Sequence, residues 1–535
     1  MPRSSLKSAA PPDWLRTAVF YQIYPQSFAD SNGDGIGDLP GIISKLPYLK
    51  ELGITAIWLN PIFESPFRDA GYDISDFRKV APRYGSNQDA VQLFQAAHQL
   101  GMRVVLDLVA GHTSDEHPWF VEAAADTRSP YRSRYLFTGA EPQTPMFGDA
   151  IPKTPQGEHY VANFLPFQPA LNFGYNQPDP ERTWQLAPGD PACLAMREEL
   201  REIMRFWLDL GCDGFRVDMA SSLIKGETDR AALQGLWQDF RTWLDSSYPE
   251  AVLIAEWSNP MDAIEAGYHV DFMIHFGEPA YTYLVGCPAE VAVQGQVPSM
   301  FFDRAGGGDI RLFVENYLKH YSATSGRGYI SLPTGNHDFH RPRRGREFAD
   351  LRVLYAMLLT MPGVPFIYYG DEIGMRNLEG IPEKEGSMWR TGDRTPMQWE
   401  KGAPNLGFSK SNPRDLYLSL DPAVDAPTVS EQLADPDSLL HFTRSLIALR
   451  RTHSALGNDG HFRPLLAEQG DCPFVYERCD DSGKYLIAIH PADTERTVEL
   501  PELLGATLLL AEGAEHTGSR LCLDGVSFAV FKLQR

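Results

Sequence analysis

The chain has 535 residues, of which 43% are hydrophobic and 22% charged, as is typical of a globular protein larger than one ordinary domain. Its formal net charge of −22 argues against nucleic acid and membrane surfaces as partners, because both are anionic and attract a basic face. The first 13 residues lack the apolar core of a signal peptide, and no apolar stretch is long enough to span a bilayer, so we expect a cytoplasmic protein.

The first part of the chain alternates short apolar runs with helical patterns. We predict strands at 19–24, 55–60 and 103–109, separated by helices at 39–52 and 88–100. The third strand is nearly all apolar, as a strand covered on both faces should be. This repeated strand–helix order indicates a parallel sheet.

The alternation stops between residues 113 and 188, where Pro, Gly, aromatic and polar residues dominate. Such a stretch is too long for an ordinary loop, so we predict a small inserted domain. The strand–helix order then resumes with a helix at 192–210, a strand at 214–218, a helix at 231–247 and a strand at 252–256.

Three further strands, at 270–275, 329–334 and 364–369, bring the number of predicted parallel strands to eight. This α/β pattern predicts a (β/α)8 TIM barrel with an inserted subdomain after strand 3. The barrel domain then comprises residues 1–112 and 189–454, and the insertion comprises residues 113–188.

The remaining segments lie outside the strand–helix repeat. Residues 370–436 are polar and rich in Pro, which predicts an active-site loop with little regular structure, and 437–451 form an amphipathic helix. Over 455–535 we predict a C-terminal antiparallel β-sandwich domain with strands at 474–478, 485–490, 497–500, 506–510 and 527–533.

Six cysteines are spread along the chain without a CxxC pair: Cys193, Cys212, Cys287, Cys472, Cys479 and Cys522. This spacing favours reduced, mostly buried thiols over a disulfide framework or a zinc site. We expect no organic cofactor, and the sequence leaves the oligomeric state open.

Arg216 and Asp218 end the fourth predicted strand, two residues apart and therefore on the same face. At the carboxyl end of a barrel strand, such a pair points into the pocket where chemistry takes place. The Arg216 guanidinium is expected to lower the pKa of Asp218 and keep it ionised, as a nucleophile must be. Taken alone, the two residues fit a structural ion pair equally well.

Three carboxylates follow predicted strands, with Asp218 after the fourth, Glu256 after the fifth and Asp338 after the seventh. Strand ends on this rim converge on one pocket. Cleavage of a glycoside with retention needs two carboxyls, a nucleophile and a proton donor. Glu256 follows an apolar run and precedes Trp257, and apolar surroundings raise the pKa of a carboxyl, which suits a proton donor.

Five motifs carry a resemblance that covers most of the chain: residues 107–112, 211–218, 255–257, 335–338 and 394–399, which read DLVAGH, GCDGFRVD, AEW, GNHD and RTPMQW. In these motifs the sequence resembles the α-amylase superfamily, glycoside hydrolase family 13, and within it the oligo-1,6-glucosidase and α-glucosidase branch. The resemblance implies that Asp218 is the nucleophile, Glu256 the general acid/base and Asp338 the carboxylate that binds the 2- and 3-hydroxyls. Arg216 then steadies the nucleophile.

The resemblance also implies substrate contacts from further residues: Asp69, Tyr72, His112, Phe164, His337 and Arg394. His112 and His337 are expected to bond sugar hydroxyls. Asp69 and Arg394 match a pair that closes over the far end of a terminal glucose, and Tyr72 matches its stacking platform. A pocket closed in this way favours an exo-acting enzyme over an open cleft.

A second site is predicted in the loop 30–38, where oxygen ligands recur at every second residue: Asp30, Asn32, Asp34, the Ile36 carbonyl and Asp38. This spacing resembles an EF-hand loop without its terminal Glu and predicts a structural Ca²⁺ or Mg²⁺. The alternative is an Asx-rich turn that binds nothing.

The chain departs from the family pattern at three positions. Gly111 replaces a usual Asn, so an amylase-type calcium is not expected there, and Ala170 replaces a usual Asp, so the carboxylate at that position is missing. Met219 follows the nucleophile at a position that varies with linkage preference, and it leaves that preference open.

We therefore expect a retaining, exo-acting α-glucosidase that acts on short oligosaccharides or α-glucosides. An α-transglucosylase, or a disaccharide isomerase resembling trehalose synthases or sucrose isomerases, could use the same residues, and residues 65–73 resemble trehalose synthases somewhat. A catalytically dead homologue is disfavoured because all three carboxylates are present.

Overall fold

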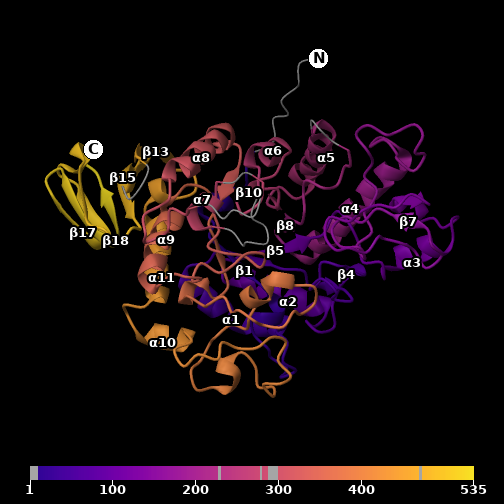
Figure 1. Ribbon diagram of the computed structural model, residues 1–535, viewed down its shortest axis with the longest axis horizontal. Coiled ribbons are helices and arrows are strands. Elements are labelled where there is room, and N and C mark those ends of the chain that lie inside the picture. Colours follow the sequence, from indigo (N-terminus) through magenta and orange to yellow (C-terminus); the bar gives the residue numbers. More distant parts are fainter. Residues whose placement is uncertain (1–9, 227–229, 278–279, 287–298, 469–472, 535) are drawn as a thin grey trace, which may run out of the picture.

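The computed structural model describes residues 10–226, 230–277, 280–286, 299–468 and 473–534. Eight parallel strands occupy its centre: β1 (Phe20–Ile23), β2 (Ala56–Leu59), β5 (Arg103–Leu108), β8 (Gly214–Val217), β9 (Val252–Ala255), β10 (Val270–Phe272), β11 (Tyr329–Ser331) and β12 (Phe366–Tyr368). Their order is β11-β10-β9-β8-β5-β2-β1-β12 (Figure 1). All eight predicted barrel strands are confirmed, because each is an apolar run that the structure buries almost completely.

Backbone hydrogen bonds also join the two end strands of this order, β11 and β12. The Val364 N–H donates to the Ile330 carbonyl over 3.2 Å, and the Thr334 N–H donates to the Phe366 carbonyl over 2.9 Å. These bonds close the sheet into a TIM barrel.

Helices surround the strands: α1 (Leu39–Leu52), α2 (Asn87–Gln99), α4 (Pro191–Leu210), α5 (Ala231–Ser247), α6 (Pro260–Glu265), α7 (Thr282–Val285), α8 (Ile310–Thr324), α9 (Phe348–Thr360) and α11 (Leu439–Thr452). The predicted helices correspond to α1, α2, α4, α5 and α11. Helix α8 was not predicted, although it is amphipathic. Helix α9 was not predicted either, because it is buried on nearly all sides and lacks a polar face.

Three segments without long regular elements adjoin the barrel. Between β5 and α4, the predicted insertion contains α3 (Pro118–Ala125), β6 (Phe137–Gly139) and β7 (His159–Tyr160), and it lies at the right of Figure 1. Between β2 and α2, β3 (Phe63–Glu64) and β4 (Asp76–Val80) form a small hairpin that was not predicted. Residues 370–436 contain 3-10 turns and α10 (Val429–Ala434), close to the irregular loop expected.

The C-terminal strands lie on the opposite side of the barrel (Figure 1): β13 (His461–Leu466), β14 (Phe474–Asp480), β15 (Gly483–His490), β16 (Arg496–Glu499), β17 (Thr507–Thr517) and β18 (Arg520–Lys532). The antiparallel arrangement is confirmed, whereas β13 was missed. Because the long strand β18 pairs with β15, β16 and β17, backbone hydrogen bonds join the six strands into one branched sheet. The sandwich stays a prediction.

The four cysteines in the described ranges are free thiols. Cys193 and Cys212 are buried as expected, but Cys479 is half-buried and Cys522 is exposed. Cys287 and Cys472 lie outside the described residues. In those same ranges, no helix combines the length and apolarity needed to cross a bilayer. The cytoplasmic location and the domain boundaries stay predictions.

Candidate active site

The carboxyl ends of the barrel strands surround a cavity of about 470 Å³, a volume typical of small-molecule sites. Eight of the ten residues predicted to be catalytic or substrate-binding line it: Asp69, Tyr72, His112, Phe164, Asp218, Glu256, His337 and Asp338. The other two, Arg216 and Arg394, are buried beneath these side chains.

Arg216 connects the catalytic carboxylates at the bottom of the cavity. Its Nη1 lies 3.1 Å from Asp218 Oδ1 and 2.8 Å from Asp107 Oδ1, and its Nη2 is in close contact with Glu256 Oε1. The predicted contact between Arg216 and Asp218 is therefore confirmed. Asp107 was known only as part of a motif, and its position beneath the guanidinium was not predicted.

The expected effect of Arg216 on Asp218 is wrong in its net direction. Burial raises the pKa of Asp218 well above the usual range, and the neighbouring Glu256 carboxylate raises it further, whereas Arg216 opposes both. The physical reason is that one positive charge is shared among three buried carboxylates. Burial likewise raises the pKa of Glu256, to about 7, as expected for a proton donor. The two carboxyls therefore titrate as a pair that retains a proton near neutral pH.

Backbone amide groups hold Glu256 and the turn that follows it. The Met219 N–H donates to Glu256 Oε2 over 2.9 Å, from a residue in the left-handed region at φ 44°. The buried Asp271 carboxylate accepts the N–H groups of Trp257 and Asn259, over 3.1 and 2.8 Å. Neither interaction was predicted, because a hydrogen bond to a backbone group leaves no motif in the sequence.

A hydrogen-bonded group of polar side chains forms one wall of the cavity. Tyr72 donates its hydroxyl proton to Asp107 over 3.0 Å, and its oxygen lies 2.7 Å from His337 Nε2. Gln22 donates to His337 Nδ1 over 2.9 Å, so we assign the ring proton to Nε2, which faces Tyr72 and Asp338. Burial lowers the pKa of His337 well below its usual range and that of His112 to about 3, so both rings are neutral.

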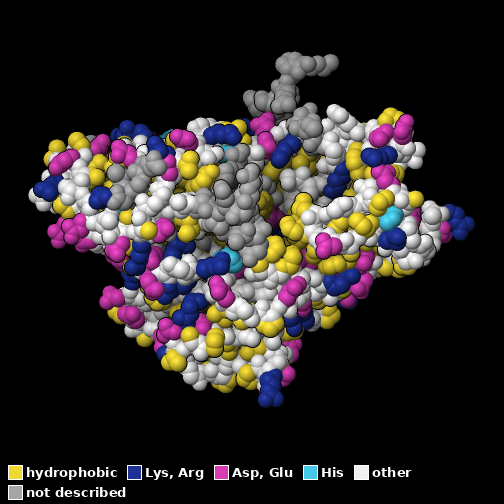
Figure 2. Space-filling model, in the orientation of Figure 1, with side chains coloured by type: hydrophobic (Ala, Val, Ile, Leu, Met, Phe, Trp, Pro, Cys, Tyr) yellow, Lys and Arg dark blue, Asp and Glu magenta, His cyan; other side chains and the backbone are white. Residues whose placement is uncertain are grey.

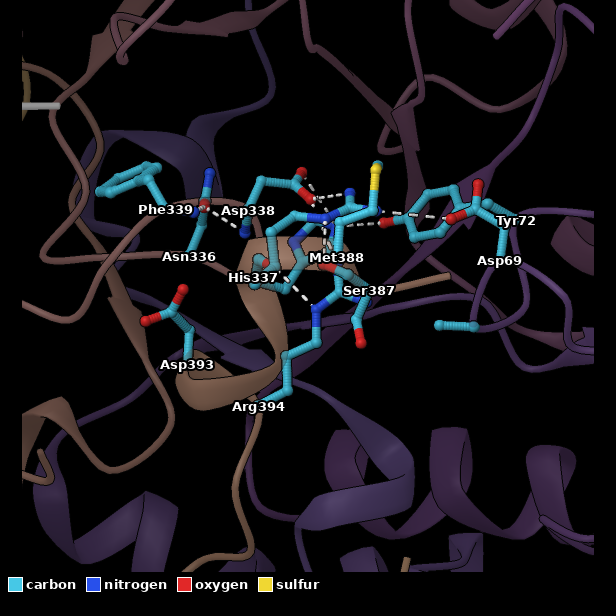
Figure 3. Close-up of polar contacts among 12 residues, drawn as sticks. Asp69, Tyr72, Asn336, His337, Asp338, Phe339, Ser387, Met388, Asp393 and Arg394 are labelled. Atoms are coloured by element: carbon cyan, nitrogen blue, oxygen red, sulfur yellow. Dashed lines mark hydrogen bonds and ion pairs between the residues drawn. The ribbon is translucent and has the colours of Figure 1, made fainter. Parts of the chain in front are cut away.

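Two arginines contact Asp338 at the far end of the cavity, and Figure 3 shows Arg394 beneath His337. Arg390 lies 3.5 Å from Asp69 Oδ1 and donates to Asp338 Oδ1 over 2.7 Å. Arg394 instead contacts Asp338 over 3.2 Å and donates to the His337 carbonyl over 2.8 Å. Arg390, which was not predicted, therefore links Asp69 to Asp338 across the cavity, and the expected contact of Asp69 and Arg394 with a terminal glucose stays a prediction.

His275 is a further lining residue that the sequence did not single out. It follows β10, and burial lowers its pKa to about 4, so it offers the cavity a neutral ring. A histidine at the last position of the strand predicted at 270–275 was the available signal.

A buried ammonium group lies beside Gly111, where the family's usual Asn is missing. Lys225 Nζ donates to Asn163 Oδ1 over 2.6 Å and to the Ser222 carbonyl over 2.7 Å. Asn163 Nδ2 in turn lies 3.2 Å from His112 Nδ1. A Cβ at Gly111 would meet that same Nδ2 at 2.8 Å, so glycine leaves the space that this arrangement needs.

In the predicted metal loop, Asp38 caps α1 by accepting the Gly41 N–H, and its other oxygen accepts the Ser31 N–H and hydroxyl. Asp30, Asn32 and Asp34 lie on one tight loop, and each accepts an amide N–H from within it. Within the described ranges, no three His, Cys, Asp or Glu side chains gather as a metal site would require. The bound metal stays a prediction.

Comparison with known proteins gives consistent matches. Residues 22–459 match the family described as "Alpha amylase, catalytic domain". An oligo-1,6-glucosidase of Parageobacillus thermoglucosidasius is 32% identical, with 90% of this chain and 91% of that protein covered. A trehalose synthase/amylase of Mycolicibacterium smegmatis is also 32% identical, with 85% and 78% covered. Among solved structures, the trehalulose synthase of Pseudomonas mesoacidophila has a TM-score of 0.80 and 27% identity, with 98% of this chain and 100% of that chain covered.

The raised pKa of Glu256 predicts an alkaline limit to activity. A general acid must be protonated, so kcat/KM on maltose or isomaltose should fall about tenfold per pH unit once the pH rises above about 7. Initial rates between pH 5 and 10 test this. The Glu256→Gln variant is the matched control, since its residual activity should not show this limb. A constant kcat/KM up to pH 9 in the unmodified enzyme would contradict the assignment.

Proposed function

The chain belongs to the alpha-amylase family and is a glycoside hydrolase, and from this premise we propose that it is a retaining, exo-acting α-glucosidase. Its substrates would be short oligosaccharides or α-glucosides with a terminal α-linked glucose. The relatives named as oligo-1,6-glucosidases support this activity, but they do not determine the linkage that this chain prefers.

One observation carries the proposal: a single guanidinium, that of Arg216, contacts both Asp218 and Glu256. Retaining glycosidases need their two carboxyls about 5–5.5 Å apart, closer than inverting enzymes do. A planar group that reaches an oxygen of each carboxyl favours the shorter separation. The contacts of Arg390 with Asp69 and Asp338 support an exo mode of action, because they close one end of the cavity.

The proposed reaction has two steps. Asp218 attacks the anomeric carbon and forms a glucosyl ester while Glu256 gives its proton to the leaving oxygen, so the glycosidic bond breaks. Glu256 then takes a proton from water, whose oxygen attacks the same carbon and releases Asp218. Two inversions return the α configuration. Asp338 and the neutral His112 and His337 are placed to bond the sugar hydroxyls as positive charge develops on the ring.

A second candidate function uses the same residues. A trehalose synthase/amylase and a trehalulose synthase are among the similar proteins, which supports a transglucosylase or a disaccharide isomerase as the alternative. In either enzyme, a sugar hydroxyl and not water would attack the glucosyl ester. The two functions differ only in how well the aglycone side of the cavity excludes water.

Two variants test the proposed roles. Asp218→Asn should lower kcat at least about 10⁴-fold with an unchanged circular dichroism spectrum, because the nucleophile is lost.

Glu256→Gln should lower kcat/KM on maltose at least about 100-fold. It should largely spare the first step on p-nitrophenyl α-glucoside, whose leaving group needs no proton. Equal losses on both substrates would show that Glu256 is not the acid, and normal turnover by Asp218→Asn would contradict its role.

We also propose that the loop 30–36 binds a structural Ca²⁺ or Mg²⁺ through Asp30, Asn32, Asp34 and the Ile36 carbonyl. These groups supply fewer oxygens than the six to eight that Ca²⁺ takes, so water would complete the shell. Addition of 1 mM Ca²⁺ or Mg²⁺ to EDTA-treated protein should then raise Tm by at least about 2 °C. The Asp34→Ala variant should lose the increase. An unchanged Tm with both ions in the unmodified protein would overturn this proposal.

A further inference from the structure

The cavity is divided between two kinds of lining. The polar residues described above surround the position of the terminal glucose. The remaining wall is apolar, formed by Met146, Phe147, Phe164, Met219, Phe276 and Trp389. In the described part of the chain, the lining adds only three polar side-chain groups beyond the glucose-binding and catalytic ones: the Ser221 hydroxyl, the His275 ring and the indole N–H of Trp389.

Three of the apolar lining residues pack together, and two others reach solvent. The ring centroids of Phe147 and Phe164 are 4.8 Å apart, and those of Phe147 and Trp389 are 6.3 Å apart. Met146 is 61% exposed and Phe276 is 38% exposed, which are high values for large apolar side chains in a folded domain. Figure 2 shows hydrophobic side chains gathered near the centre of the molecule, in front of the barrel strands.

This surface adjoins the side from which a leaving group departs. Met219 directly follows the nucleophile, and its N–H bonds Glu256, the proposed proton donor. Phe276 follows His275, with their ring centroids 5.2 Å apart, at the end of β10 beside β9 and Glu256. The group attached to the scissile oxygen must leave along this wall.

A second sugar is poorly suited to such surroundings. Each sugar hydroxyl taken from water needs a hydrogen-bond partner, and burial without one is unfavourable. The His275 ring is neutral, so among the described lining residues the only charged side chains are the catalytic and glucose-binding ones. An alkyl or aryl group needs no such partners and gains from burial against Met, Phe and Trp.

We infer that the aglycone subsite of this enzyme prefers an apolar group, so that alkyl or aryl α-glucosides are better substrates than α-linked disaccharides. This inference rests on the proposed function, since it concerns the leaving group of that reaction. The same surface would make an alcohol or phenol a better acceptor than a sugar in any transfer reaction.

The test compares kcat/KM for methyl α-glucoside, n-hexyl α-glucoside, maltose and isomaltose, measured by glucose release. The two alkyl glucosides have leaving groups of similar basicity, so their ratio reports aglycone binding and not chemistry. We expect the hexyl glucoside to exceed the methyl glucoside at least about tenfold, and to exceed both disaccharides. A hexyl-to-methyl ratio below about threefold, or a disaccharide preferred over the hexyl glucoside, would overturn the inference.

Matched variants locate the effect. Met146→Ser and Phe276→Ser should each lower the hexyl-to-methyl ratio at least about threefold. Leu504→Ser, at an equally exposed (61%) residue outside the cavity lining, should leave the ratio unchanged. Equal ratios in all three variants and the unmodified enzyme would contradict the assignment of the surface. No glucose from any of the four substrates would contradict the proposed function itself, and the aglycone preference with it.

Discussion

The active site depends on one buried positive charge, the guanidinium of Arg216, which is shared by Asp107, Asp218 and Glu256. Removal of one partner from such a buried group costs about 3–5 kcal/mol, because the remaining charges lose their compensation. Because one cation cannot balance three carboxylates, the pair of Asp218 and Glu256 also retains a proton. The same imbalance that makes Arg216 necessary therefore prepares Glu256 to act as an acid.

The rest of the chain serves to surround these groups. The closed barrel fixes Asp218 and Glu256 at adjacent strand ends, where main-chain hydrogen bonds determine their spacing. Irregular segments contribute further side chains to the site. The segment after β12 contributes Arg390, and the insertion contributes Asn163, which links the buried Lys225 to His112. The rigid part of the protein carries the chemistry, and the long loops shape the pocket.

Much of this could be predicted from the sequence, for identifiable reasons. The barrel strands are apolar runs with clear ends, so all eight were predicted, whereas α9 has no polar face to reveal its period. The carboxylates at the strand ends could be assigned because strand ends line the pocket of a barrel and glycoside cleavage needs carboxyls there. The contacts of Arg390 with Asp69 and Asp338 could not be, since only three-dimensional packing decides which of two nearby arginines reaches across the cavity. The capping role of Asp38 was also missed, because an oxygen ligand and a helix cap use the same residue type.

The central claim is that glucose is released through two inversions at one carbon. The most direct measurement is ¹H NMR of the glucose first released from p-nitrophenyl α-glucoside, whose leaving group is not a sugar, recorded before mutarotation mixes the anomers. The account predicts that α-glucose appears first and that the β-anomer grows only later. Initial release of β-glucose would mean a single displacement, and would contradict both the role of Asp218 as a nucleophile and the reading of Arg216 as the bridge between two cooperating carboxyls.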